Sequence, residues 1–274
     1  MRYHEFAPDS ALAPWVKCFW LMENLPGAGD GPMDAVVPDG CPEIIVHYGD
    51  RFVEEVGGRR RGQPGAIVAG QLPRPLLLRP TGRIGMVAAR FRPDGVFALF
   101  GLPMHELVDR RVPLDAIRGD APALQGRIAE ASSDRERVAH LAAFLKRQLA
   151  RRHRVDLDPL IQHNVQAIIA SGGSISLDEL AVRAGVTARQ LERRFQVCVG
   201  VSPKFLCRII RFRRVFDRLR DQTPWPMIAL RCGFFDQSHL IRDFKQFAGQ
   251  SPTAFLASQS WFARCFTQCE TARC

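Results

Sequence analysis

The sequence predicts an α+β protein, in which a β-rich, barrel- or sandwich-like amino-terminal domain with flanking helices precedes an all-helical carboxy-terminal domain. Three observations predict this division. Short apolar runs separated by Pro and Gly fill residues 35–91, helical periodicity takes over after residue 95, and a stretch near the carboxy terminus is written twice. A chain of 274 residues is also long enough for about two domains.

The amino-terminal apolar runs are typical of strands, because they are short and bounded by turn residues. Several such runs at near-regular spacing indicate a small barrel or sandwich. They occupy residues 35–37, 43–48, 66–69, 76–78 and 84–91. We expect the basic segment Gly57–Gly62 to be an exposed loop at a hairpin tip, although its three arginines could also contact phosphate.

Helical patterns begin with two short helices, at residues 96–100 and 104–108. Ser133 and Glu136 then have the spacing of a capping box, in which Glu136 reaches back to the capping residue. One apolar stripe follows at helical spacing, formed by Val138, Leu141, Leu145 and Leu149. This stripe could pack within the chain or against a second subunit.

The polar segment 150–156 separates two parts of different composition, and we place the domain boundary there. The predicted units are a regulatory, effector-binding or dimerisation domain at 1–155, a DNA-binding domain at 156–258 and a tail at 259–274. Asp158 and Pro159 open the second unit, with Asp158 as the N-cap residue and Pro159 at the first helical position.

The repeat lies in this second unit. Leu191–Pro203 recurs as Leu240–Pro252 at an offset of 49 residues, whereas Gly185 recurs as Gly233 at an offset of 48. The second copy therefore has one extra residue between its glycine and its leucine. Each copy has the pattern of a helix, a glycine turn and a second helix.

Capping residues define the helices of both copies. Ser176 is expected to cap a helix at 177–184, and Thr187 a helix at about 188–196. In the second copy Asp236 is the expected cap. Gly185 and Gly233 occupy turns that need a left-handed residue.

The exposed faces of the second helices carry side chains that suit DNA, because Arg can bond to guanine and Gln to adenine in the major groove. Our base-reading candidates are Arg189, Arg193, Gln237, Ser238, His239 and Arg242. Gln190 and Arg194 lie on the same exposed faces. Lys204 and Arg208 are phosphate-binding candidates on a long helix that begins at Pro203, runs to about Gln222 and would be about 28 Å long.

Charge supports a nucleic-acid partner. The formal net charge is +10, and residues 174–257 contain 14 Lys and Arg but only 7 Asp and Glu. Helix-turn-helix pairs also occur as plain packing units, and a basic surface can simply be solvated. Two matching copies with polar exposed faces in a basic segment favour DNA binding.

Residues 158–256 resemble the DNA-binding domain of AraC/XylS-type transcription regulators. The resemblance rests on Leu177–Ala181, Gly185–Thr187, Gly200–Pro203, Gly233–Leu240 and Gly249–Pro252. Phe235, Asp243 and Trp225 depart from the family pattern. Residues 15–114 more weakly resemble the β-rich amino-terminal domains of some of these regulators.

The resemblance implies a sequence-specific, effector-responsive activator with double-stranded promoter DNA and RNA polymerase as partners. A small-molecule effector and a homodimer stay open. We expect no enzymatic activity, no cofactor and no metal, because the His-x-His pair of a metal-dependent cupin, a nucleophile elbow and a phosphate loop are all missing.

Two alternatives concern the cysteines. An Ada-like repair protein needs four zinc thiolates near its amino terminus, but only Cys18 and Cys41 lie in the first 150 residues. A redox- or metal-responsive regulator could use Cys265, Cys269 and Cys274 in the tail.

The sequence also predicts a cytoplasmic protein with no membrane partner. It has no apolar run long enough for a membrane span, and Glu5 and Asp9 stand where a signal peptide needs an apolar core.

Overall fold

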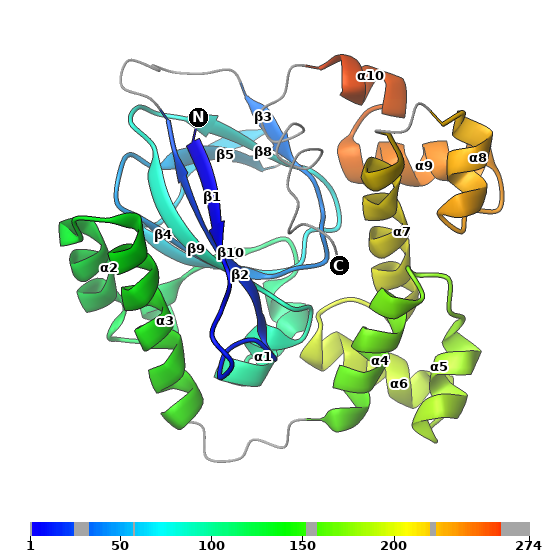
Figure 1. The fold of residues 1–274 in the computed structure, drawn as a ribbon, viewed down its shortest axis with the longest axis horizontal. Helices are drawn as coiled ribbons and strands as arrows, with labels where there is room; N and C mark the ends of the chain where they lie inside the picture. The colour runs from blue at the N-terminus through cyan, green and yellow to red at the C-terminus, as the bar shows by residue number, and fades with distance from the viewer. Residues whose placement is uncertain (1, 25–32, 57, 152–157, 220–222, 259–274) are drawn as a thin grey trace.

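The computed structural model describes residues 2–24, 33–56, 58–151, 158–219 and 223–258. A β-rich domain with helices on one side lies beside a group of helices from the carboxy-terminal half (Figure 1). The predicted α+β organisation is therefore confirmed.

The described residues form two antiparallel sheets. The six-stranded sheet has the order β1-β2-β9-β4-β7-β10, and the four-stranded sheet has the order β3-β8-β5-β6. The strands are β1 Arg2–Phe6, β2 Val16–Glu23, β3 Asp34–Val36, β4 Glu43–His47, β5 Phe52–Val56, β6 Arg59–Gly62, β7 Ala66–Ala69, β8 Leu76–Pro80, β9 Gly85–Phe91 and β10 Arg111–Pro113. The two sheets face each other as an open sandwich rather than a closed barrel.

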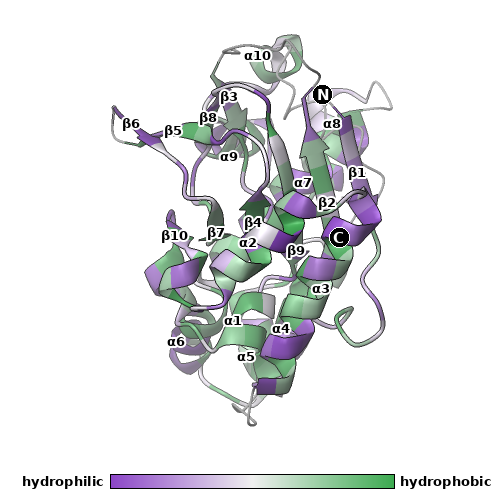
Figure 2. Ribbon diagram, turned by 90° about the vertical axis from the view of Figure 1, so that its left-hand side faces the viewer, coloured by the Kyte–Doolittle hydropathy of each residue, from purple (hydrophilic) through white to green (hydrophobic). Residues whose placement is uncertain are grey.

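All five predicted strands are present, but one predicted loop is a strand. Residues 59–62 form the edge strand β6, which pairs with β5 and is exposed at every position. Its hydrophilic ribbon projects from the body of the domain (Figure 2). A charged edge strand of this kind resists pairing with other chains, so the arginines need no ligand to explain them.

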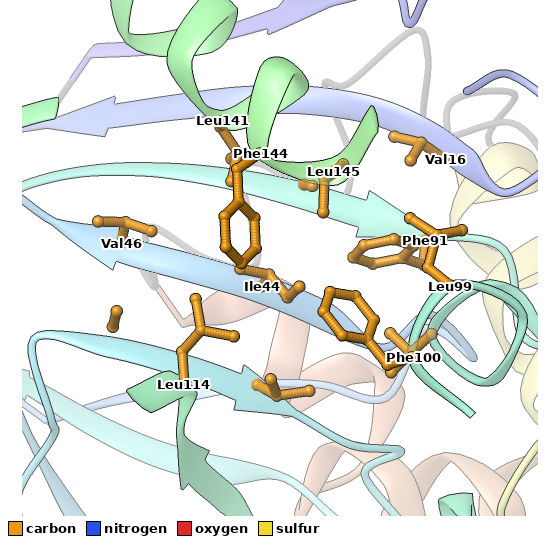
Figure 3. Packing of buried hydrophobic residues seen from close by; sticks show 14 of the residues in the cluster. Val16, Ile44, Val46, Phe91, Leu99, Phe100, Leu114, Leu141, Phe144 and Leu145 are labelled. Atoms are coloured by element: carbon orange, nitrogen blue, oxygen red, sulfur yellow. The ribbon is translucent and has the colours of Figure 1, made fainter. Parts of the chain in front are cut away.

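The helices of this domain cover one face of the six-stranded sheet. They are α1 Gly95–Phe100, α2 Ala121–Glu130 and α3 Asp134–Arg151, with short 3₁₀ turns η1 Met104–Leu107 and η2 Leu114–Ala116. Leu141, Phe144 and Leu145 of α3 are fully buried and point at the strands that carry Ile44 and Phe91 (Figure 3). The apolar stripe therefore packs within the chain.

The predicted capping box is only partly correct. The Glu136 amide donates to the Ser133 hydroxyl at 3.3 Å, as expected. The Glu136 carboxylate, however, accepts from the amide and hydroxyl of Ser132, at 2.8 and 2.9 Å. Ser132 offers two donors to the returning carboxylate, which explains why it displaces Ser133 as the partner.

Within the described residues, the carboxy-terminal half contains helices and no strands. Its helices are α4 Pro159–Ala170, α5 Leu177–Ala184, α6 Ala188–Cys198, α7 Pro203–Leu219, α8 Trp225–Arg231, α9 Gln237–Ala248 and α10 Pro252–Ala257. The long helix α7 runs between a lower group, α4 to α6, and an upper group, α8 to α10 (Figure 1). No helix in the described ranges is both long and apolar enough to cross a bilayer.

Asp158 precedes α4 at the N-cap position, but its side chain makes no capping hydrogen bond. Its carboxylate instead lies 3.3 Å from the Arg194 guanidinium on α6. Asp158 therefore occupies the predicted N-cap position, but the predicted capping hydrogen bond is absent, because its carboxylate forms an ion pair with a neighbouring helix.

The two domains pack against each other along α7. Gly40, at φ +78°, lies so close that a Cβ there would approach Leu206 to 3.2 Å and Ile209 to 3.5 Å. Val37 is buried within the hydrophobic cluster of the upper helices. Loop 37–41 of the β domain therefore forms part of the support of the helical domain.

Candidate nucleic-acid interface

The first helix-turn-helix unit consists of α5 and α6. The Ser176 hydroxyl accepts from the Glu179 amide at 3.1 Å and begins α5. Gly185, at φ +62°, ends it in the left-handed conformation that glycine adopts without strain. Thr187 and Gln190 then form a capping box at the start of α6.

The second unit, α8 and α9, repeats this arrangement. Gly233 has φ +80°, and the next amide, of Phe234, bonds to the Ala229 carbonyl at 2.9 Å. The Asp236 carboxylate accepts from the His239 amide at 2.7 Å and begins α9. The expected caps and turn glycines are thus confirmed in both units.

The hydrogen bonds also locate the extra residue of the second turn. In the first unit the amide of Val186 bonds to Ala181, so Val186 and Phe234 are equivalent positions. Thr187 caps α6 directly after Val186, whereas Phe235 intervenes before the Asp236 cap. Phe235 is therefore the inserted residue, and it is 92% exposed.

Helix α7 holds both units through different faces. Leu206 and Ile210 pack with Leu191 and Phe195 in one buried cluster. The other cluster joins α7 to the upper helices and includes Phe212, Val215, Phe216, Leu240 and Phe244. The seventeen described residues give α7 a length of about 25 Å and place the two units at its opposite ends; its expected end near Gln222 lies outside the described residues.

Most of the predicted DNA-binding side chains lie on exposed faces. Those classed as exposed are Arg189, Gln190, Arg193, Arg194, Lys204, Ser238 and Arg242, and those classed as half-buried are Gln237, His239 and Arg208. The Gln190 amide oxygen accepts from Thr187, and Arg194 pairs with Asp158, so these two side chains already have partners within the protein.

Arg208 is the predicted site residue most involved in the fold. Its guanidinium bonds to the carboxylate of Asp243, with the shortest contact at 2.7 Å, and stacks near Phe205 and Phe247. Asp243 is 2% exposed and also lies 3.7 Å from the His239 ring. This pair joins α7 to α9 and orients His239 at the start of α9.

Three other arginines of α7 are engaged by partners within the protein. Arg211 and Arg214 donate to the carbonyls of Gly173 and Gly172, which follow the end of α4. Burial lowers the pKa of Arg211. Arg213 is buried at the domain interface, 3.6 Å from the Asp39 carboxylate. Much of the basic charge that the sequence displays here therefore supports the fold.

A second candidate site is a cavity of about 110 Å³ between the two sheets of the β domain. Its wall is mainly apolar and includes Trp20, Met22, Phe52, Leu76 and Leu78. One part is charged, where the Arg90 guanidinium lies 2.8 Å from Glu43 and 3.3 Å from Asp39. Arg213 of α7 also lines the cavity, so both domains contribute to it. Sequence patterns alone gave no sign of this cavity.

Cys18, Cys207 and Cys232 are buried and are poor candidates for a thiol sensor, because burial raises the pKa of each thiol. Burial raises the pKa of Cys18 to about 12 and that of Cys207 to about 11, which keeps both as unreactive thiols at neutral pH. Within the described ranges no group of three or more His, Cys, Asp or Glu side chains could hold a metal. The tail cysteines Cys265, Cys269 and Cys274 lie outside the described residues.

Comparison with known families agrees with this geometry. Residues 180–258 match a family described as a helix-turn-helix domain, and residues 4–113 match a domain of unknown function, DUF6597. The HTH-type transcriptional regulator GbdR of Pseudomonas aeruginosa is 37% identical over 83 residues, which are 28% of this chain and 22% of that protein. The chain thus matches only about a fifth of the length of this curated relative.

Among solved structures, ToxT of Vibrio cholerae aligns with 86% of this chain and 98% of its own, at 12% identity and a TM-score of 0.48. An AraC-type DNA-binding domain-containing regulator of Chromobacterium violaceum aligns with 42% of this chain and 98% of its own, at 23% identity and a TM-score of 0.35. The family match at 180–258 and the GbdR relative confirm that the carboxy-terminal domain resembles AraC-type helix-turn-helix regulators.

Proposed function

We propose that the protein is a sequence-specific transcription regulator that places α6 and α9 in two adjacent major-groove segments of promoter DNA. The observation that carries this proposal is the duplicated helix-turn-helix geometry at opposite ends of one rigid helix. Major-groove segments on one face of a duplex repeat about every 34 Å. An α7 of about 25 Å, with a reading helix beyond each end, is compatible with that spacing.

Within this proposal the amino-terminal parts of α6 and α9 read bases, as in other helix-turn-helix proteins. Arg189 and Arg193 serve the first segment, and Gln237, Ser238 and Arg242 serve the second. His239 also faces this second segment, with its ring fixed by Asp243. Gln190, Arg194, Lys204 and Arg208 contribute through phosphate contacts or by supporting their neighbours.

The test is selection of bound fragments from a random duplex pool with the full chain, at physiological ionic strength. We expect one recurring site with two conserved segments. Affinity should fall steeply with salt, because bound Lys and Arg release counterions from the phosphates. Recovery of no common sequence would overturn the proposal.

We also propose that the β domain binds a small molecule in the cavity between its sheets, and that residues 1–155 and 156–258 act as separate sensing and DNA-binding units. The cavity supports this view, because about 110 Å³ is well above the roughly 10–15 Å³ that one water needs. Its apolar wall and charged end suit a compact, mostly apolar molecule with a polar group.

Screening a metabolite collection by thermal unfolding tests this second proposal. We expect a ligand that raises the unfolding temperature of the natural chain and changes its DNA affinity. The cavity-filling variant Ala69→Phe should abolish both effects, whereas Val56→Phe on the exposed part of β5 should not. A ligand whose effects survive in Ala69→Phe binds elsewhere.

Activation of transcription, which the resemblance implies, requires contact with RNA polymerase at the bound promoter. A reporter with the selected site placed upstream of a weak promoter tests the sign of regulation. We expect expression to rise when the protein is present, and a fall would identify a repressor.

A further inference from the structure

Phe235 is a large apolar side chain in an unusual place. It is 92% exposed and directly precedes Asp236, the N-cap residue of α9. Single exposed apolar residues are common on protein surfaces. This one, however, stands at the amino-terminal end of a candidate reading helix, whose exposed side chains Ser238 and Arg242 are polar.

The fold does not explain the phenyl ring. A hydrophobic residue before an N-cap often packs on the fourth helical residue, here Leu240, as a hydrophobic staple. The exposure of Phe235 excludes such packing. Its amide donates to the His239 ring at 3.5 Å, a bond that any residue except proline could make. Its φ is not positive, so the backbone imposes no special residue either.

The first unit has no counterpart, because Phe235 is the residue inserted into the second turn. Val186, equivalent to Phe234, is followed at once by the Thr187 cap. Any role of the phenyl ring therefore belongs to the second unit alone.

We propose that Phe235 is a specificity-determining residue that packs on the 5-methyl group of a thymine in the major-groove segment read by α9. This inference rests on the proposed function. A phenyl ring offers no hydrogen bond to a base edge, and the thymine methyl is the apolar group that the major groove presents. The contact would remove both apolar surfaces from water.

The experiment replaces thymine by uracil, which removes only the methyl group, at each position of the selected site. For the natural chain we expect one thymine, in the segment read by α9, at which the replacement weakens binding about three- to tenfold. Phe235→Ala should weaken binding to the unmodified site by a similar factor and should no longer respond to that replacement.

Two further variants sharpen the test. Phe235→Leu keeps an apolar side chain and should retain part of the response. Leu230→Ala removes another exposed apolar side chain of the same unit, 68% exposed on α8, and should behave as the natural chain does. The dependence of affinity on salt should be unchanged in Phe235→Ala, because no charge is lost.

The outcomes distinguish a failure of the role of Phe235 from a failure of the proposed function. Equal responses of the natural chain and Phe235→Ala to every thymine replacement would overturn the role of Phe235 and leave the proposed function intact. A thymine whose response is lost in Phe235→Ala but which lies in the segment read by α6 would do the same. A chain with no sequence preference at all would remove the proposed function and this inference together.

Discussion

Replacing Phe212 by alanine should disrupt the packing of α9, the second reading helix, against α7. Phe212 is fully buried on α7. Its ring centroid lies 5.1 Å from that of Phe216 on the same helix, and 5.1 and 5.3 Å from those of Phe244 and Phe247 on α9. The side chain therefore joins α7 to α9 directly.

The loss of stability can be estimated from this environment. Truncating a buried Phe to Ala costs about 3–5 kcal/mol, through lost transfer free energy and the cavity left behind. Each aromatic pair adds about 0.5–1.5 kcal/mol beyond burial, so we expect the upper part of the range. Native domains have only about 5–15 kcal/mol in total, and the upper helices should therefore open first.

Two measurements check this prediction. Urea unfolding gives the change in the free energy of unfolding, and footprinting on the selected site reports the two segments separately. We expect Phe212→Ala to lose protection of the segment read by α9 while keeping the segment read by α6.

The matched control is Ile210→Ala, which truncates a residue 2% exposed on the other face of α7, in the cluster of the first unit. It should show the opposite pattern. Two results would refute the view that α7 supports the two helix-turn-helix units separately. One is a decrease in the free energy of unfolding below about 1 kcal/mol for Phe212→Ala. The other is loss of protection of both DNA segments in both variants.

Three further predictions concern DNA contacts, acid stability and the domain interface. Arg193→Ala should cost about 1–3 kcal/mol of binding free energy and relax specificity at one position of the site. Lys204→Ala should instead weaken binding to all sequences and reduce the slope of affinity against salt by about 1. If binding titrations show that Arg193→Ala weakens binding equally on all sequences, Arg193 contacts a phosphate rather than a base. Burial lowers the pKa of His47 to about 4, whereas the unfolded chain binds the proton from about pH 6.5 downward, so the free energy of unfolding should fall by up to about 3 kcal/mol as the pH drops from 6.5 to 4. In His47→Gln the free energy of unfolding should depend less on pH in that window. An equal slope in both proteins would argue against the pKa shift. Breaking a buried ion pair typically costs about 3–5 kcal/mol. Arg213→Met should destabilise the chain by less, because Asp39 retains its ion pair with Arg90. A double-mutant cycle with Asp39→Asn measures the coupling energy between Arg213 and Asp39, and a coupling near zero would show that this pair does not hold the domains together.

Sequence reasoning located the helical domain closely because its signals are local. A cap such as Asp236 satisfies amides three residues away, and a turn glycine such as Gly233 meets a backbone requirement at its own position. These constraints act within a few residues, so they are visible in the chain itself.

Features that depend on distant partners were less accessible. Strand β2 is buried at nearly every position and so lacks the alternation that marks a half-exposed strand. The partner of Arg208 is Asp243, which lies 35 residues away. No local sequence pattern distinguishes an arginine that stabilises a pair of helices from one that binds a DNA phosphate.

The cavity leaves no local signal in the sequence for a related reason. It forms where two sheets and α7 meet, and its wall combines residues from Tyr3 to Arg213. Only the register and packing of both domains bring these side chains together. The exposed ring of Phe235 was visible in the sequence as a departure from a family pattern, but only the structure shows that the fold leaves it in solvent.

Methylation-interference footprinting of the full chain on its selected site most directly tests whether α6 and α9 contact two separate major-groove segments. We predict two groups of purines whose major-groove methylation blocks binding, about one helical turn apart on one face of the duplex, with Arg193→Ala affecting one group and Arg242→Ala the other. A single contiguous group, or two groups on opposite faces, would contradict the account.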